Sequence, residues 1–348
     1  MSKNIQIRSI VYAFLAAVFY AVNVPMSKLL LNYVNPTTMA AFLYLGAGIG
    51  IAMLSLVNKK DMNNFERLSK KDLPFVIGMI VLDIAAPIFL MLGISYGTSA
   101  NASLIGNFEI VATTVIALFL FNETVSKRLW VAIALITLSS IILSFEGVDS
   151  FKFSYSSLFV LLATICWGFE NNCTRNISSK NTYEIVILKG FFSGLGALVI
   201  AIIKREQLPR ISYIATALFL GFVAYGLSIF LYVRAQNMLG ASKTSAYYAV
   251  NPFIGVFLSF ILFKEKLSSM YMIALLVMIA GSTLVVVDTL IHHHGHVHQH
   301  TFVHTHDGLT HTHMISHSHM HNHYVTDDKH HHRHTKTELE QNHKTAHC

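Results

Sequence analysis

Apolar residues fill most of the chain in long runs that short polar segments interrupt. Ten runs of roughly 20 residues fall between Ser9 and Ile291, and that is the length an α-helix needs to cross the hydrocarbon core of a bilayer. The runs cover residues 9–31, 37–57, 74–96, 98–121, 127–145, 154–176, 184–203, 212–235, 240–263 and 270–291. The pattern predicts an all-α integral membrane protein with ten transmembrane helices.

Composition excludes a soluble protein and divides the chain in two. The chain is 53% apolar and only 12% charged, whereas soluble domains carry about 25% charged residues. All 20 histidines lie between His292 and His347, so residues 292–348 form a separate His-rich tail. Because this tail has few apolar residues, it cannot bury enough surface to fold, and we expect it to be disordered.

Lysine and arginine are distributed unevenly between alternate loops. If the N-terminus is cytoplasmic, the inner segments before the tail hold 13 of these residues and the outer loops hold 6. Basic residues are retained on the cytoplasmic side, and in a membrane protein they report orientation rather than binding to nucleic acid. We therefore expect a multi-pass protein of the cell membrane with both termini in the cytoplasm and no nucleic-acid partner.

The two halves of the membrane part resemble each other. The matching stretches are 121–126 (FNETVS) with 263–268 (FKEKLS), and the pair Gly46 and Gly50 with the pair Gly190 and Gly194. Each half has five runs, an odd number, so the second half must be inserted upside down relative to the first. Such inverted repeats are typical of transporters, which bind substrate near the bilayer midplane. We expect repeats at 1–146 and 154–291, with the glycine pairs providing close helix contacts.

Three stretches of the sequence carry a resemblance to a known family. They are 96–123 (beginning YGTSANASLIGNFE), 239–265 (beginning LGASKTSAYYAVNP) and 166–168 (CWG). In this order they resemble the EamA-like branch of the drug/metabolite transporter superfamily, and the His-rich tail resembles that of one subgroup. The resemblance implies ten-helix carriers that perform secondary transport, usually efflux, without naming a substrate. The family usually has proline at the position of Ile110, as this chain has at Pro252, so we expect 98–121 to lack the helix bend of 240–263.

Polar side chains inside the spans are the candidates for a transport path. A charge or an amide in hydrocarbon costs several kcal/mol unless it faces a cavity or a partner. Trp167, Glu170 and Asn171 share one face of a helix because they follow the spacing i, i+3, i+4. This face either lines the path or packs against a neighbouring helix through polar contacts.

The first span carries a similar polar face. Tyr20 and Asn23 lie near Pro25, which removes a backbone donor and interrupts the helix. Asn23 is the repeat mate of Asn171. The two asparagines either hold a polar substrate or clamp the first and sixth spans together, and the sequence favours neither interpretation.

Three carboxylates and one ammonium lie well inside the spans. Asp83, Glu109 and Glu170 are candidate proton carriers. Lys189 is their candidate cationic partner, and a static ion pair that holds the bundle together is the alternative. Further along the chain, Tyr225, Tyr248 and Asn251 offer aromatic and amide surfaces that suit an organic, amphipathic substrate.

The tail repeats the pattern His-x-His, and an extended chain places such i, i+2 residues on one side. Imidazole binds zinc, nickel, cobalt and copper well. The candidate ligands are His304, His306, His311, His313, His317, His319, His321, His323, His330, His331, His332 and His334. We expect the tail to bind these metals, while the membrane part requires no cofactor.

The sequence leaves three functions open. The leading hypothesis is a secondary transporter that exports a small organic solute by alternating access. The second is a transporter of divalent transition metals, or a carrier that metals regulate through the tail. The third is a membrane metal sensor that transports nothing. The spans contain no histidine and the chain has no P-loop or dinucleotide motif, so we expect no enzyme; a homodimer remains an open alternative.

Overall fold

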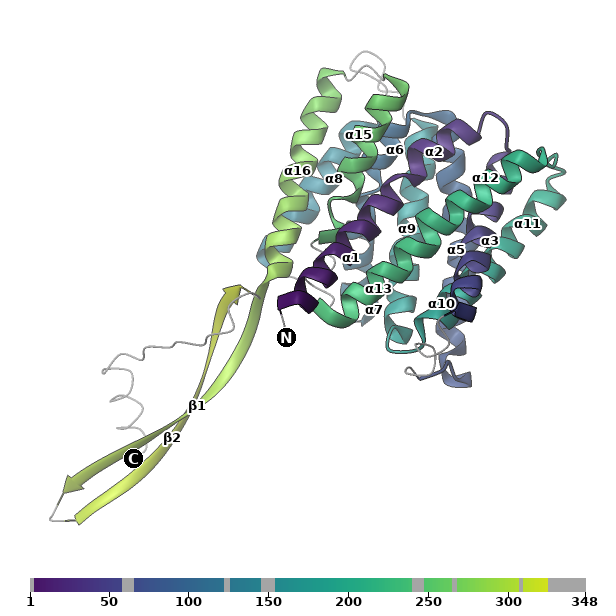
Figure 1. The fold of residues 1–348 in the computed structure, drawn as a ribbon. Coiled ribbons are helices and arrows are strands. Elements are labelled where there is room, and N and C mark those ends of the chain that lie inside the picture. The colour runs from purple at the N-terminus through teal and green to yellow at the C-terminus, as the bar shows by residue number, and fades with distance from the viewer. Residues whose placement is uncertain are drawn as a thin grey trace. The chain divides into compact units, whose positions relative to one another are not determined.

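The computed structural model describes residues 3–57, 66–121, 126–144, 154–239, 247–264, 268–306 and 309–324. The chain divides into two compact units, Met1–Asp288 and Thr289–Cys348. In the described residues the first unit is a bundle of long helices, and the second contains a two-stranded hairpin (Figure 1).

The first part of the bundle runs to residue 144. Its helices are α1 (Lys3–Ala21), α2 (Asn23–Leu30), α3 (Pro36–Val57), the short 3₁₀ turn η1 (Lys70–Asp72), α5 (Leu73–Tyr96), α6 (Ser99–Ile105), α7 (Phe108–Phe121) and α8 (Lys127–Ser144). Two of the predicted spans are thus interrupted, the first between α1 and α2 and the fourth between α6 and α7.

The second part of the bundle begins at residue 155. Its helices are α9 (Tyr155–Ile177), α10 (Thr182–Leu188), η2 (Lys189–Ser193), α11 (Gly194–Ile203), α12 (Ile211–Gly221), η3 (Phe222–Leu227), α13 (Ser228–Leu239), α15 (Asn251–Phe263) and α16 (Ser269–Leu290). Both η2 and η3 are π-helical turns. Such turns are rare and occur often at functional sites.

Length and apolarity identify most of the predicted spans. Within the described residues, eight helical segments are long and apolar enough to cross a membrane. The two other predicted spans coincide with α9, a 23-residue helix that carries many polar residues, and with α15, which has 13 residues. The prediction of a multi-pass membrane protein is confirmed, and the count of ten spans stays a prediction.

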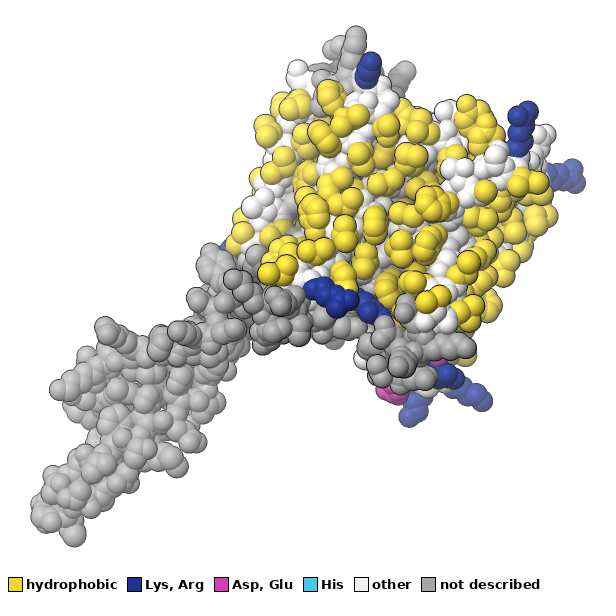
Figure 2. Space-filling model, viewed as in Figure 1, with side chains coloured by type: hydrophobic (Ala, Val, Ile, Leu, Met, Phe, Trp, Pro, Cys, Tyr) yellow, Lys and Arg dark blue, Asp and Glu magenta, His cyan; other side chains and the backbone are white. Residues whose placement is uncertain are grey.

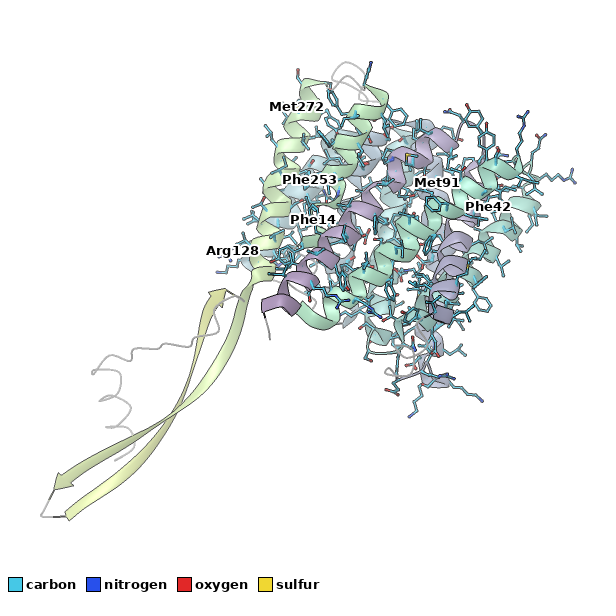
Figure 3. All side chains as sticks on the ribbon, in the orientation of Figure 1. Phe14, Phe42, Met91, Arg128, Phe253 and Met272 are labelled. Atoms are coloured by element: carbon cyan, nitrogen blue, oxygen red, sulfur yellow. The ribbon has the colours of Figure 1, made fainter. Side chains whose placement is uncertain are left out.

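The outer surface of the bundle is largely apolar. Figure 2 shows hydrophobic side chains spread over the visible face, with Lys and Arg side chains toward its ends. Phe14 of α1 and Met272 of α16 are 50% and 42% exposed, whereas Met91 of α5 is fully buried (Figure 3). A surface of this kind matches contact with lipid, which solvates apolar side chains without the cost that water imposes.

The break between α6 and α7 corrects one expectation. The turn falls at Gly106 and Asn107, where the amide of Asn107 donates to the carbonyl of Leu104 at 3.2 Å. The expectation that this span continues without a bend, because Ile110 replaces a proline, is therefore wrong. Glycine and asparagine have low helix propensity and favour turns, so the pair interrupts the helix without proline.

Glycines allow α3 to pack closely against helices from the second part of the bundle. A Cβ atom on Gly46 would lie 2.0 Å from the carbonyl oxygen of Leu218 in α12. A Cβ atom on Gly190 would lie 2.3 Å from the amide nitrogen of Gly48. Any larger side chain would force these backbones apart, which supports the packing role expected for Gly46 and Gly190.

The second unit differs from the disordered tail that composition predicts. Over residues 291–324 it has two strands, β1 (Ile291–His306) and β2 (Leu309–Tyr324), which pair antiparallel. The repeated His-x-His pattern has the two-residue period of a strand, and β-branched residues alternate with many of the histidines, so the segment suits an extended ladder. His330, His331, His332 and His334 lie outside the described residues.

Candidate functional site

A buried ion-pair centre joins three helices of the bundle. Lys189 Nζ lies 3.1 Å from Asp83 Oδ2 and 2.9 Å from Glu170 Oε1. The side chains of Lys189, Asp83 and Glu170 are 9%, 0% and 2% exposed. The predicted pairing of Lys189 with a carboxylate is therefore present, and it involves two carboxylates, one from α5 and one from α9. We call these three residues the Lys189 centre.

Neutral side chains hydrogen-bond to both carboxylates of the Lys189 centre. The hydroxyl of Tyr44, on α3, donates to Asp83 Oδ1 at 2.8 Å. The hydroxyl of Thr174 donates to Glu170 Oε1, and Trp167 Nε1 donates to the Tyr44 hydroxyl at 3.5 Å. Tyr44 is not among the site residues predicted from the sequence, although it is the single tyrosine of the run 37–57 and lies near its middle. If both carboxylates are ionised, the centre carries one excess negative charge.

Glu109 lies apart from this centre. Its Oε1 accepts a hydrogen bond from Asn171 Nδ2 at 2.7 Å, and the same amide donates to Thr113 Oγ1 at 3.2 Å. Among the described Lys and Arg side chains, none forms an ion pair with Glu109. The polar face predicted on α9 thus divides between two partners: Glu170 belongs to the Lys189 centre, and Asn171 contacts α7.

A small cavity of about 40 Å³ adjoins Glu109. Its polar and aromatic lining residues include Tyr20, Ser103, Glu109, Trp167 and Asn251. This volume holds only a few water molecules, whereas pockets for organic ligands measure about 300–1,000 Å³. The cavity is therefore too small for an organic solute in this conformation.

Three helix ends meet at this cavity. Ala21 ends α1, Gly106 lies between α6 and α7, and Asn251 begins α15, and all three residues line the cavity. Helix ends leave backbone N–H and C=O groups without helical partners. Carriers use such interrupted helices to bind substrates and ions.

Asn23 and the predicted tyrosines form a neighbouring aromatic group. Asn23 Nδ2 donates to the Tyr225 hydroxyl at 2.9 Å. The Tyr225 ring lies 5.6 Å from Tyr20 and 5.0 Å from Tyr44, and Tyr248 lies 6.2 Å from Tyr20. Asn23 therefore contacts η3, while its repeat mate Asn171 contacts α7, so the two asparagines have different partners.

Eight of the twelve predicted metal ligands of the tail fall on the hairpin. His304 stands opposite His311 in the ladder, and His317, His319, His321 and His323 follow at alternate positions of β2. His306 and His313 also lie on these strands. Among the side chains that the structure describes, no cluster of three or more His, Cys, Asp or Glu residues could hold a metal ion.

Known proteins resemble this chain in sequence and in fold. An uncharacterized transporter of Methanothermobacter thermautotrophicus is 25% identical over 76% of this chain and 82% of its own length. The uncharacterized transporter YyaM of Bacillus subtilis is 20% identical over 70% of this chain and 82% of its own length. One solved crystal structure, 13% identical, superposes with a TM-score of 0.60 over 81% of this chain and 96% of that chain, which concerns the fold alone.

The family to which the chain belongs is identified by a family model. The model of the EamA-like transporter family matches residues 7–145 and matches again at 154–287. The two matches cover most of the membrane unit and well over half of the chain, and they confirm the resemblance found in the sequence motifs. The chain belongs to the EamA-like transporter family.

Proposed function

We propose that this membrane transporter exports a small organic solute across the cell membrane by alternating access. The family and the two transporter relatives support a membrane transporter of the drug/metabolite type. The solute class, the direction and the mechanism are our proposal. Its main support is the Lys189 centre, three charged side chains buried in a bundle whose exterior is largely apolar.

The energetics of buried charge favour a functional role for this centre. Each charged side chain at the middle of a membrane helix costs about 2.5–3.5 kcal/mol on insertion scales. A buried ion pair is a weak source of stability, because apolar side chains of similar size often stabilise a protein equally well or better. A bundle that only needed to pack would therefore gain little from Lys189, Asp83 and Glu170.

Alternating access draws support from the two family matches. We propose that residues 1–146 and 154–291 are two inverted five-helix repeats that move relative to each other. The contacts of α3 with α12 and η2 lie between these two segments. The cavity at Glu109 is too small for an organic solute, so the proposal requires a second conformation that opens a path to it.

Transport by reconstituted protein tests this function. Proteoliposomes are loaded with a panel of amphipathic organic solutes, and efflux is measured with and without a pH gradient. Glu170→Gln and Asn171→Ala should lose transport while they insert and fold normally. Glu184→Gln, a carboxylate that pairs with Arg67 outside the centre, is the matched control. If both site variants keep full transport activity, the polar face of α9 serves helix packing and the substrate site lies elsewhere.

We also propose that both termini are cytoplasmic, as the bias of Lys and Arg between loops favours. Single cysteines at Asn35 and Ser150 should react with a membrane-impermeant maleimide added from outside. A cysteine at Asn63 should react only after the membrane is opened. Reaction of the cysteine at position 63 with maleimide added outside intact cells would show that the orientation is the opposite one.

A second proposal concerns metal binding by the tail. In the ladder, His292, His294, His296 and His298 stand opposite His323, His321, His319 and His317. Alternate residues of a strand share a face, so four cross-strand histidine pairs follow one another on one face of the hairpin. We propose that this ladder binds zinc, nickel, cobalt or copper as an accessory chelator.

Truncation after Ile291 separates this proposal from its alternatives. The truncated protein should lose metal binding and keep transport of the organic solute. Binding by the full chain should weaken below a pH of about 6.5, since a metal ligand must be a deprotonated imidazole. If truncation abolishes a metal flux that the full chain supports, metal is the cargo; if neither protein transports anything, a sensor is the better interpretation.

A further inference from the structure

The hydroxyl of Ser103 is an unexplained polar group at the cavity. Ser103 is 5% exposed, lines the cavity beside Glu109, and its Oγ has no hydrogen-bond partner within the described structure. Buried polar atoms normally have a partner, so an unpartnered one at a cavity suggests a ligand that the hydroxyl contacts.

A backbone oxygen lies near the same place. Pro25 has no N–H and cannot donate the helical hydrogen bond to the carbonyl of Ala21. A Cβ atom on Gly255 would lie 2.9 Å from Ser103 Oγ and 3.5 Å from this Ala21 oxygen. The two oxygens therefore face one small space, and it stays open because residue 255 is glycine.

Among the residues that the structure describes, no cation contacts the Glu109 carboxylate at the cavity. Ionisable groups near Glu109 come from several elements: Tyr20 of α1, Glu170 of α9, Lys189 of η2, Tyr225 of η3, and Tyr248. Lys189 is the cation of this set, and it contacts Asp83 and Glu170 at 3.1 Å and 2.9 Å. Lys189 therefore pairs with those two carboxylates, and within the described residues the donor to the Glu109 carboxylate is the neutral amide of Asn171.

We propose that this cavity binds a small monovalent cation, Na⁺ or a proton, whose binding is coupled to solute transport. A carboxylate, a hydroxyl and a carbonyl freed by a helix break are the oxygen donors that carriers use for such ions. A volume of about 40 Å³ suits a small ion with a water molecule rather than an organic cation. Na⁺ would contact all three oxygens, whereas a proton would bind Glu109 alone. The coupling rests on the proposed transport function, but the cation site does not.

Binding to the purified full-length protein in detergent tests the site directly. We expect radioactive sodium to bind saturably, to be displaced by unlabelled NaCl but not by choline chloride, and to raise the melting temperature. Glu109→Gln should abolish binding. Ser103→Ala and Gly255→Ala should each weaken it about tenfold, by removing one oxygen and by filling the space between two.

A matched serine controls for damage to the fold. Ser140→Ala removes a hydroxyl that is equally buried but bonds within its own helix, to the carbonyl of Ile136 at 2.9 Å. It should bind sodium as the wild type does. The melting temperature of every variant in choline chloride identifies those that fail to fold.

The same variants test whether the bound cation is a proton. If the cation is a proton, sodium does not bind, and lowering the pH raises the melting temperature of the wild type more than that of Glu109→Gln. Ser103→Ala then behaves like the wild type. Absence of both sodium binding and any pH difference between the wild type and Glu109→Gln would overturn the cation site. If solute transport depends on neither a sodium gradient nor a pH gradient, the coupling is refuted and the transport function stands. If the protein binds the cation but transports no solute, the transport function is refuted and the cation site stands.

Discussion

The Lys189 centre and the Glu109 cavity lie in the same bundle but differ in how their charges are balanced. In the centre, an ammonium contacts two carboxylates, and Tyr44 and Thr174 donate further hydrogen bonds to them. In the cavity, a carboxylate has one amide donor and adjoins open space and an unpartnered hydroxyl. Asp83 and Glu170 thus have a protein cation as partner, whereas Glu109 has a neutral amide, and this difference is the reason that we propose the ion site at Glu109 and not at the Lys189 centre.

The largest effect should come from removing the ammonium of the centre. Lys189→Met leaves Asp83 and Glu170 facing each other without a cation, and breaking a buried pair costs about 3–5 kcal/mol of unfolding free energy. Thermal unfolding in detergent micelles measures the loss. Lys204→Met removes an ammonium that is 46% exposed and should change the melting temperature little. Equal effects of the two variants would mean that Lys189 does not stabilise the bundle.

A smaller loss should follow when the hydroxyl of Tyr44 is removed. Tyr44→Phe keeps the ring but deletes the 2.8 Å hydrogen bond to Asp83, and bonds to charged groups contribute about 1.5–3 kcal/mol. The same unfolding assay applies, with Tyr33→Phe, a 60% exposed tyrosine, as control. An unchanged melting temperature for Tyr44→Phe would indicate that water replaces the hydroxyl.

Glu109→Gln should act in the opposite direction to Lys189→Met. It removes a buried charge without a protein cation, so the unfolding free energy measured in choline chloride should stay unchanged or rise by about 1–3 kcal/mol. The hydrogen bond from Asn171 can be retained by the glutamine carbonyl. A loss as large as that of Lys189→Met would show that both carboxylate sites are structural and would remove the distinction between them.

Glu206, in the loop between α11 and α12, gives the smallest expected effect and serves as a partly buried reference in a loop. Its Oε2 accepts from the amide and the hydroxyl of Thr38, at 2.8 Å and 2.7 Å. Burial raises the pKa of Glu206, but the hydrogen bonds from Thr37 and Thr38 and the nearby Lys204 outweigh it and lower the pKa overall.

A lowered pKa in the folded state fixes the sign of the pH dependence. Glu206 contributes stability above the ordinary pKa of glutamate, and this contribution is lost as the pH falls through the lowered value. Glu206→Gln should therefore cost less than about 1 kcal/mol near neutral pH, and the difference should vanish in acid. A difference in melting temperature that grows as the pH falls would contradict this assignment.

Much of the helix layout could be predicted from the sequence, because apolar runs and Pro25 report directly on membrane helices and their breaks. The break at Gly106 and Asn107 was missed because the expectation relied on proline alone. The π-helical turns at Lys189–Ser193 and Phe222–Leu227 have no simple sequence signal. They depend on how whole helices pack, which a single sequence does not reveal.

The site was predictable to a similar degree. A charge in hydrocarbon requires a partner, so an ion pair between Lys189 and a carboxylate could be expected. Which carboxylates it contacts depends on α5 packing along α9, a tertiary contact. Tyr44 and Ser103 were missed because tyrosine is common in apolar helices, and a helical serine usually bonds to its own backbone.

The π-helical turns have a consequence for how variation in this chain should be read. Lys189 and Tyr225 each lie on a turn that accommodates more residues than an α-helix does. Deleting one codon within either turn would restore a regular α-helix that keeps the register of the flanking segments, but Lys189 or Tyr225 within the turn would point in a new direction. A related chain could then keep every side chain of the Lys189 centre and still not assemble it, so alignments of relatives should be judged by gaps in these two turns as well as by residue identity.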